Sequence, residues 1–210
     1  MAGLRERTAL CSDGELDLLL RPLLLKYEEL PKLRHDATTD ALTGLKNRRT
    51  FEEHLGREIN RARRYGSFFA LLLLNVRNLK SVNETLGHST GDEILRAVAR
   101  ASVETIRGCD SCCRIGGDES GILLQQADRS SAEAFAERIA RKFESFAKPL
   151  APNSAVRIGY GIAVFREGGQ DATSLCQFAE KDLVVRPPGS PLREGKYSKA
   201  SNAANKGSNS

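Results

Sequence analysis

The residues whose types could do chemistry gather in three short segments of this 210-residue chain, namely Asp40 to Arg49, Leu71 to Asp92 and Arg114 to Ser120. In the third segment two glycines are followed directly by the acids Asp118 and Glu119, and apolar runs stand on both sides. Paired glycines between apolar runs predict a β-hairpin, because glycine accepts the positive φ that tight turns demand. The two carboxylates therefore fall in a predicted turn.

Single polar residues in these segments also have purely structural explanations. Asn83 is compatible with a turn cap, Asp92 with the N-cap of a helix that follows Gly91, and Lys80 with a solvated side chain. A functional role for any of these residues therefore has to be argued from the order and spacing of the three segments together.

The cysteines raise the question of zinc or redox chemistry, because Cys109 and Cys112 form a CxxC pair. A structural zinc site needs four ligands, and the sequence supplies no second CxxC and no nearby pair of histidines. The five cysteines are an odd number and include two adjacent residues, which is not typical of a disulfide framework. We interpret them as small apolar residues of a cytoplasmic protein in a reducing compartment.

Composition narrows the class of protein. Hydrophobic residues make up 40% of the chain and charged residues 28%, which is enough for an ordinary globular core. The formal net charge of +5 suits a phosphate-bearing ligand, but no stripe of basic and aromatic residues predicts nucleic-acid binding. The leucine-rich stretch from Leu16 to Leu25 is too short to span a bilayer and contains charges, so we expect no membrane insertion.

Apolar periodicity predicts the elements that must position these residues. Helices are predicted over about 13–37, 49–64 and 172–185, after Gly91, and around Phe135 to Phe146. A central strand covered on both faces is predicted for Phe68 to Val76, and a half-buried strand for the alternating segment from Val156 to Val164. Two short strands, 112–115 and 122–124, form the predicted hairpin.

These elements predict an α/β (α+β) domain with a central mixed, mostly antiparallel sheet flanked by helices. We divide the chain into a helical lead-in over 1–37, a domain over 38–186 and a tail over 187–210. The tail is rich in Ser, Asn, Lys and Gly, has almost nothing to bury, and is predicted to be disordered.

The order and spacing of the three segments resemble the GGDEF (diguanylate cyclase) family of bacterial signalling domains. The chain carries Asp40-Ala-Leu-Thr-Gly-Leu-Lys-Asn-Arg-Arg49, then Leu71-Leu-Leu-Leu-Asn-Val-Arg-Asn-Leu-Lys80, then Arg114-Ile-Gly-Gly-Asp-Glu-Ser120. The resemblance covers about residues 36–185. It implies a palm-like fold shared with nucleotide cyclases, and a reaction that condenses two GTP into cyclic di-GMP across a homodimer.

The resemblance also implies which residues hold the divalent ion, Mg²⁺ or Mn²⁺, that the family uses. By position the metal ligands are Asp118, Asn75 and the backbone carbonyl of Val76, and Glu119 assists the attacking 3′-hydroxyl. Divalent ions bridge phosphate oxygens and stabilise the negative charge that develops in phosphoryl transfer. Asp118 and Glu119 are accordingly the expected catalytic residues.

This sequence departs from the family pattern at the metal site. The family has Asp-x-Asp where this chain has Asn75 and Arg77, so the local formal charge changes from −2 to +1. Ser120 replaces the phenylalanine of the GGDEF motif, and Pro187 stands in place of a phosphate-binding lysine. These changes predict a degenerate member of the family.

The ligand-binding residues are better matched to the family. The resemblance assigns guanine recognition to Asn83 and Asp92, and phosphate binding to Lys80 and to the segment around Asn78 and Leu79. It further assigns an inhibitory product site to Arg107 and Asp110, whose side chains can form charge-assisted hydrogen bonds with guanine. The alternative for that pair is a surface salt bridge.

Three functions remain open at this level. The first is a regulatory module that binds GTP or cyclic di-GMP with little or no catalysis. The second is a working diguanylate cyclase that tolerates Asn75, and the third is a dimeric scaffold that binds no nucleotide. An upstream sensor or a partner protein would supply the signal.

Overall fold

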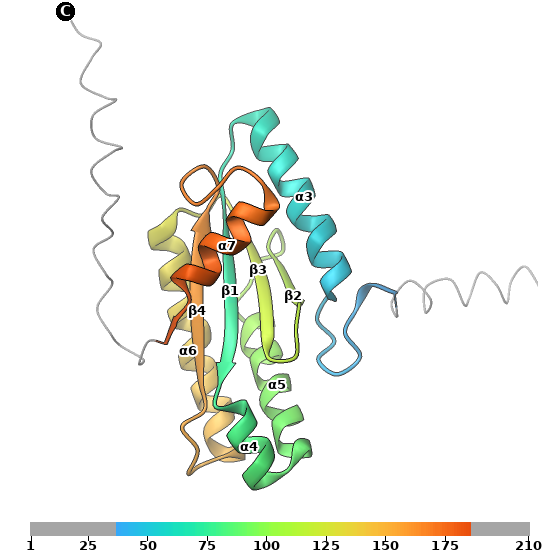
Figure 1. Ribbon diagram of the computed structural model, residues 1–210, viewed down its shortest axis with the longest axis vertical. Coiled ribbons are helices and arrows are strands. Elements are labelled where there is room, and N and C mark those ends of the chain that lie inside the picture. The colour runs from blue at the N-terminus through green and yellow to red at the C-terminus, as the bar shows by residue number, and fades with distance from the viewer. Residues whose placement is uncertain (1–36, 186–210) are drawn as a thin grey trace, which may run out of the picture.

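The computed structural model describes residues 37–185, so the predicted lead-in helix and tail lie outside the described residues. A five-stranded sheet with the order β2-β3-β1-β4-β5 forms the centre, with helices packed on it (Figure 1). The elements are, in chain order, α3 (Arg48–Tyr65), β1 (Phe69–Arg77), α4 (Leu79–Leu86), α5 (His88–Val103), β2 (Ser111–Arg114), β3 (Glu119–Gln125), α6 (Arg129–Leu150), β4 (Arg157–Val164), α7 (Ala172–Asp182) and β5 (Val184–Val185). The predicted α+β class is confirmed.

The central strand β1 is the run of leucines that the sequence predicted to be covered on both faces, and its first six residues are all buried. It pairs with β3 on one side and with β4 on the other. Each of the strand pairs described is antiparallel, and the parallel character of the predicted mixed sheet is limited to an isolated bridge between Lys46 and Cys113.

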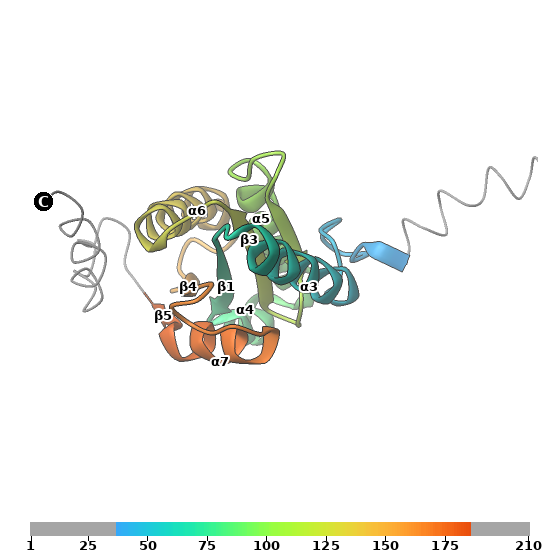
Figure 2. The ribbon, with the colours of Figure 1, turned by 90° about the horizontal axis from the view of Figure 1, so that it is seen from above.

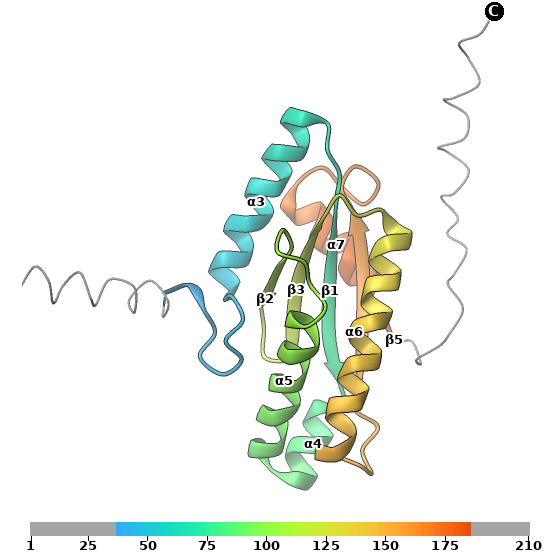
Figure 3. The ribbon, with the colours of Figure 1, turned by 180° about the vertical axis from the view of Figure 1, so that it is seen from behind.

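Alternating residues of β1 build a separate core on each face of the sheet. Ala70, Leu72 and Leu74 pack with buried residues of α5 and α6, whereas Leu71 and Leu73 pack with those of α3 and α7. Figure 2 shows α5 and α6 on one side of the sheet with α3 and α7 on the other, and Figure 3 shows the α5–α6 face from behind. Leucine on both faces of one strand therefore specifies a three-layer domain.

The prediction of a half-buried β4 is wrong, because seven of its eight residues are buried. The residues that alternate with its large side chains include Gly159, Gly161 and Ala163, and α7 covers this small-residue face. A Cβ atom at Gly161 would lie 1.9 Å from the carbonyl oxygen of Ala179. Gly161 is therefore required because the backbone of α7 approaches β4 closely at this position.

Helix α7 ends at Asp182, earlier than the predicted end near Val185, because Val184 and Val185 pair with β4 as a short strand. Beyond this pairing, Ile162 at the edge of β4 bonds to side chains. Its N–H donates to Asp182 Oδ2 at 3.0 Å, and its carbonyl accepts from Arg129 Nη1 at 3.4 Å. The Arg129–Asp182 ion pair, at 2.6 Å, closes this part of the sheet edge.

Two helices, α4 and α5, follow β1 in the chain, and α5 packs beside α6 on one face of the sheet. The sequence did not predict α4, which has only eight residues, and the second of the pair, α5, begins at His88 and not after Gly91. In the described part of the chain, no helix combines the length and the apolar composition needed to cross a bilayer.

Candidate functional site

The predicted metal and catalytic residues meet where β1 ends beside the β2–β3 hairpin. Asn75 is the register partner of Glu119, and the backbone N–H of Val76 donates to the carbonyl of Asp118 at 3.0 Å. Asn75, Val76, Asp118 and Glu119 therefore occupy neighbouring backbone positions, although they come from two segments more than forty residues apart in sequence.

The predicted hairpin is present, but the reason given for its glycines is wrong. Neither Gly116 nor Gly117 has a positive φ. A Cβ atom at Gly116 would instead lie 2.8 Å from Glu119 Oε2, so this glycine makes room for the Glu119 carboxylate. The amides of Ile115 and Gly116 both donate to the Glu119 carbonyl, at 3.0 and 3.2 Å, which closes the turn.

Arg114 fixes the hairpin to the first motif, a role that the sequence analysis did not assign. Its guanidinium contacts Asp40 Oδ1 at 3.1 Å and the carbonyls of Gly116 and Gly117 at 3.2 and 2.7 Å. Both side chains of the ion pair are mostly shielded, with 16% and 24% of their surfaces exposed. Burial raises the pKa of Asp40, but hydrogen bonds from Thr43 and Arg114 outweigh it and lower the pKa below its ordinary value.

A cavity of about 450 Å³ lies beside this hairpin. It is lined by four predicted site residues, Leu79, Lys80, Asn83 and Asp118, together with two that were not predicted, Glu84 and His88. The Lys80 side chain is 90% exposed and lies 3.8 Å from Glu84, so it is free to reorient toward a ligand. The signal for His88 was its place in the second motif.

Asn83 presents an unused hydrogen-bond acceptor at this cavity. Its Oδ1 is buried and has no partner among the described residues. A Cβ atom at Gly91 would lie only 1.8 Å from that oxygen, so the absence of a side chain at Gly91 lets α5 approach Asn83. A buried acceptor without a partner costs about 1–3 kcal/mol, which a ligand donor would recover.

Asp92, the second predicted guanine-reading residue, lies half-buried one residue beyond Gly91 within α5. The alternative that Asp92 is an N-cap is wrong, because α5 begins at His88 and its N-cap position is Gly87. Asn83 is not a side-chain cap either, since α4 contains it and the bond at Gly87 is made by the Asn83 backbone carbonyl. Both structural explanations for the pair are thereby removed.

The predicted phosphate-binding segment begins at Asn78, which has a φ of 63° and is the N-cap residue of α4. Its side-chain amide donates to the carbonyl of Ala155 at 2.9 Å, which ties this turn to the loop before β4. No side chain caps the first amides of α4. Because the N-terminal amides of a helix favour anions, this end of α4 suits a phosphate group.

The residues at the strand end do not fit the family's divalent ion. Within residues 37–185, no cluster of three or more His, Cys, Asp or Glu side chains could hold a metal. Asn75 contributes a neutral amide, and Arg77, on the same face of β1, contributes a positive charge. The Arg77 Nε atom is buried and has no hydrogen-bond partner in the described part of the chain.

The predicted product-binding pair lies at the other end of β3. Arg107 is exposed, and it lines a second cavity of about 260 Å³ with Asp110, Phe135 and Arg138. The Asp110 carboxylate accepts from the backbone amides of Arg107 and Gln125, at 3.0 and 3.2 Å. Among the described residues the two side chains form no salt bridge with each other, so the Arg107 guanidinium remains available.

The CxxC pair has the properties expected of ordinary thiols. Cys109 is exposed and Cys112 is buried, and neither forms a disulfide. Burial raises the pKa of Cys112 to about 12, so this thiol is not a thiolate at neutral pH.

Comparisons with known proteins agree with this geometry. The family model described as diguanylate cyclase, GGDEF domain, matches residues 37–185. The diguanylate cyclase DosC of Escherichia coli is 38% identical over 175 residues, which cover 82% of this chain and 36% of DosC. The chain thus spans about a third of the length of this relative.

Two solved structures are also similar. The coiled-coil and GGDEF domain of DgcB from Caulobacter crescentus, in complex with c-di-GMP, has a TM-score of 0.71 at 24% identity, covering 80% of this chain and 90% of that one. The diguanylate cyclase SiaD from Pseudomonas aeruginosa, in complex with its activator SiaC, has a TM-score of 0.62 at 28% identity, covering 86% and 74%. Together with the motifs and the site, the family match establishes that this chain belongs to the GGDEF-domain (diguanylate cyclase) family.

Proposed function

We propose that this GGDEF domain is a regulatory module of cyclic di-GMP signalling that binds cyclic di-GMP and a guanine nucleotide with little or no catalysis. The observation that carries the proposal is Arg77, a half-buried arginine whose Nε atom is buried and has no hydrogen-bond partner in the described part of the chain, at the strand end where the family holds its metal ion. The two ligand-binding regions, around Asn83 and around Arg107, keep cavities and unused polar groups.

Electrostatics argues against the family reaction at this site. A guanidinium about 6 Å from a divalent ion opposes its binding by roughly 5 kcal/mol at an effective dielectric of ~20. Asn75 supplies no charge to offset this repulsion, and Asp118 is the one acid left of the predicted ligands. The site therefore carries too little negative charge to hold the divalent ion that the condensation of two GTP requires.

Binding of cyclic di-GMP is supported at the other cavity. Arg107 is exposed there, and Arg138 of α6 lines the same cavity as a second guanidinium. Guanidinium groups bind the O6/N7 edge of guanine and phosphate oxygens through paired hydrogen bonds. The DgcB domain was solved in complex with c-di-GMP, which supports the same ligand class here.

Isothermal titration with cyclic di-GMP tests the receptor function. The wild-type chain should bind, and Arg107→Ala should weaken binding about 10-fold or more through loss of a charge-assisted contact. Arg141→Ala removes an exposed arginine from α6 outside both cavities and is the matched control, which should bind like wild type. No binding by wild type, or equal losses in both variants, would contradict the receptor function.

The active cyclase is the competing function, because Asp118 and Glu119 are retained. The assay incubates the chain with GTP and Mg²⁺ or Mn²⁺ and measures cyclic di-GMP. We expect no product from wild type, and Asn75→Asp combined with Arg77→Asp is the variant that restores the family's acids. Product formation by wild type at a rate near that of the restored variant would favour the cyclase.

The assembly in which the domain acts is part of the proposal. We expect a homodimer that receives its signal from an upstream sensor or a partner protein. The relative SiaD was solved with its activator SiaC, which supports regulation by a protein partner. Analytical ultracentrifugation with and without cyclic di-GMP measures the oligomeric state.

A further inference from the structure

Two arginines occupy paired positions on neighbouring strands at the end of β1, close to the position where the family holds a metal. Arg77 on β1 is the register partner of Arg157 on β4. In the described part of the chain neither side chain forms an ion pair or a hydrogen bond, and the Arg77 Nε atom is buried. Like charges at directly opposite positions of neighbouring strands repel, and buried donors are normally paired, so this arrangement lacks an anion.

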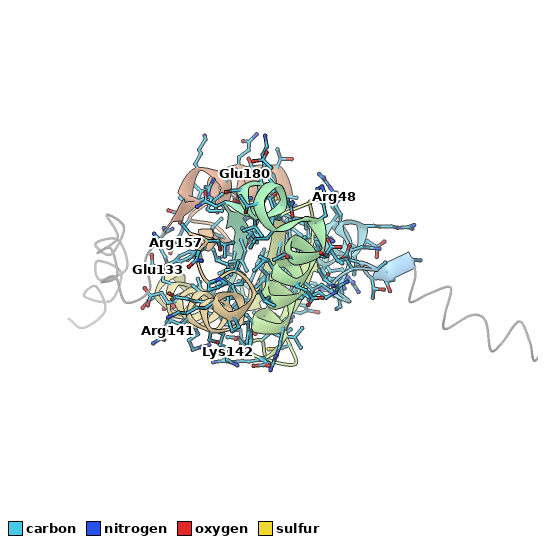
Figure 4. The ribbon with its side chains drawn as sticks, turned by 90° about the horizontal axis from the view of Figure 1, so that it is seen from below. Arg48, Glu133, Arg141, Lys142, Arg157 and Glu180 are labelled. Atoms are coloured by element: carbon cyan, nitrogen blue, oxygen red, sulfur yellow. The ribbon has the colours of Figure 1, made fainter. Side chains whose placement is uncertain are left out.

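The surroundings of this pair suit a phosphate group. Arg77 directly precedes Asn78, the N-cap residue of α4, and the first amides of α4 carry no side-chain cap. Lys80, on the first turn of α4, adds a third cation and lines the 450 Å³ cavity. Figure 4, seen from below, shows Arg157 on the side of α6, well away from Arg48 near α3.

We propose that Arg77 takes the place of the divalent ion, so that this chain binds the phosphates of a guanine nucleotide without metal. A guanidinium forms two parallel hydrogen bonds with phosphate oxygens and carries the positive charge that a metal would supply. Mg²⁺ bound to the nucleotide competes for the same oxygens. Magnesium therefore weakens nucleotide binding here, where a metal-dependent site would need it.

This inference rests on the proposed nucleotide site at Asn83, and it is independent of cyclic di-GMP binding at Arg107. The two cavities share no lining residue. A titration with cyclic di-GMP therefore reports on the receptor function, whereas a titration with GTP reports on the metal-free site.

The decisive experiment titrates GTP into the full chain by calorimetry, first with EDTA and then with excess Mg²⁺. We expect binding in EDTA that is equal to or tighter than binding in Mg²⁺. Binding that requires Mg²⁺, or no GTP binding in either buffer, would overturn the inference. This comparison uses the wild-type chain and needs no variant to fold.

Variants identify the residue responsible. Arg77→Gln should weaken GTP binding in EDTA by about 10- to 100-fold, because it removes a charge-assisted contact. Arg157→Gln, which changes an exposed residue, should weaken it less. Arg141→Gln removes the same charge from the outside of α6 and should bind GTP like wild type. Unchanged affinity in Arg77→Gln would exclude Arg77 as the phosphate-binding group.

Discussion

Adding a single methyl group on α5 should weaken the binding of a guanine nucleotide without lowering the stability of the domain. In Gly91→Ala, the new Cβ would lie 1.8 Å from Asn83 Oδ1, so the Asn83 side chain must move. The obstructing atom is the end of a flexible side chain, so it can move with little effect on the backbone. Alanine in place of glycine within a helix is itself worth about 1 kcal/mol.

We therefore expect Gly91→Ala to weaken nucleotide binding while leaving the stability of the fold nearly unchanged. A shifted Asn83 rotamer costs about 0.5–1.5 kcal/mol, which offsets the helix propensity of alanine and leaves the free energy of unfolding nearly unchanged. The displaced amide loses hydrogen bonds with the base worth about 1–3 kcal/mol, which corresponds to a roughly 5- to 150-fold weaker Kd for GTP.

The matched control is Gly56→Ala, because Gly56 also lies within a helix but has no atom within 4 Å of its added Cβ. This variant should be about 1 kcal/mol more stable and should bind GTP like wild type. Urea denaturation measures the stability of each variant, and calorimetry measures the Kd.

A double-mutant cycle tests whether the changes at Gly91 and Asn83 act through the same side-chain amide. Asn83→Ala should weaken GTP binding as much as Gly91→Ala does, and the two changes together should cause no further loss, because they act through one amide. If Gly91→Ala binds GTP as tightly as wild type, or if the two losses add, then Asn83 does not read the base from its position beside Gly91.

Three further predictions follow from contacts elsewhere. Asp182→Ala removes the acceptor for the Ile162 N–H and an ion pair, so it should lower the free energy of unfolding in urea by about 2 kcal/mol. The pKa of His54 is lowered by burial and by nearby Lys and Arg, so protonation opposes folding. Unfolding experiments across pH should show stability falling as pH drops below the ordinary value of 6.5, and His54→Gln should lose this dependence. A thiol reagent should modify Cys109 in the native protein but Cys112 only after unfolding, and rapid native labelling of Cys112 would contradict its burial.

Local patterns predicted the fold where one residue type dominated both faces of an element. The leucines of β1 indicated a strand covered on both sides, and this is confirmed. The same reasoning failed for β4, because glycines that look exposed in a sequence can be covered by a helix backbone, as at Gly161. Helix α4 was missed because eight residues give too little periodicity.

The site was predictable to the extent that motif spacing encodes it. Motif positions led to Leu79, Lys80, Asn83 and Asp118, which line one cavity. Contacts between distant segments were not predictable, because no local pattern specifies them. The Arg114–Asp40 ion pair joins residues 74 positions apart, and the Arg138 side chain enters the second cavity from a helix that follows β3.

The two cavities lie at opposite ends of β3, since the Asp118 cavity adjoins its first residue, Glu119, and the Asp110 cavity includes its last, Gln125. Seven extended residues separate occupants by about 20 Å, so a molecule in one place cannot block entry to the other. Any mutual influence between the two sites must act through the structure of the domain and obey thermodynamic reciprocity. If a bound guanine nucleotide changes the affinity for cyclic di-GMP by some factor, cyclic di-GMP would change the affinity for the nucleotide by the same factor. Measuring both affinities would therefore give the coupling free energy between the two ends of β3.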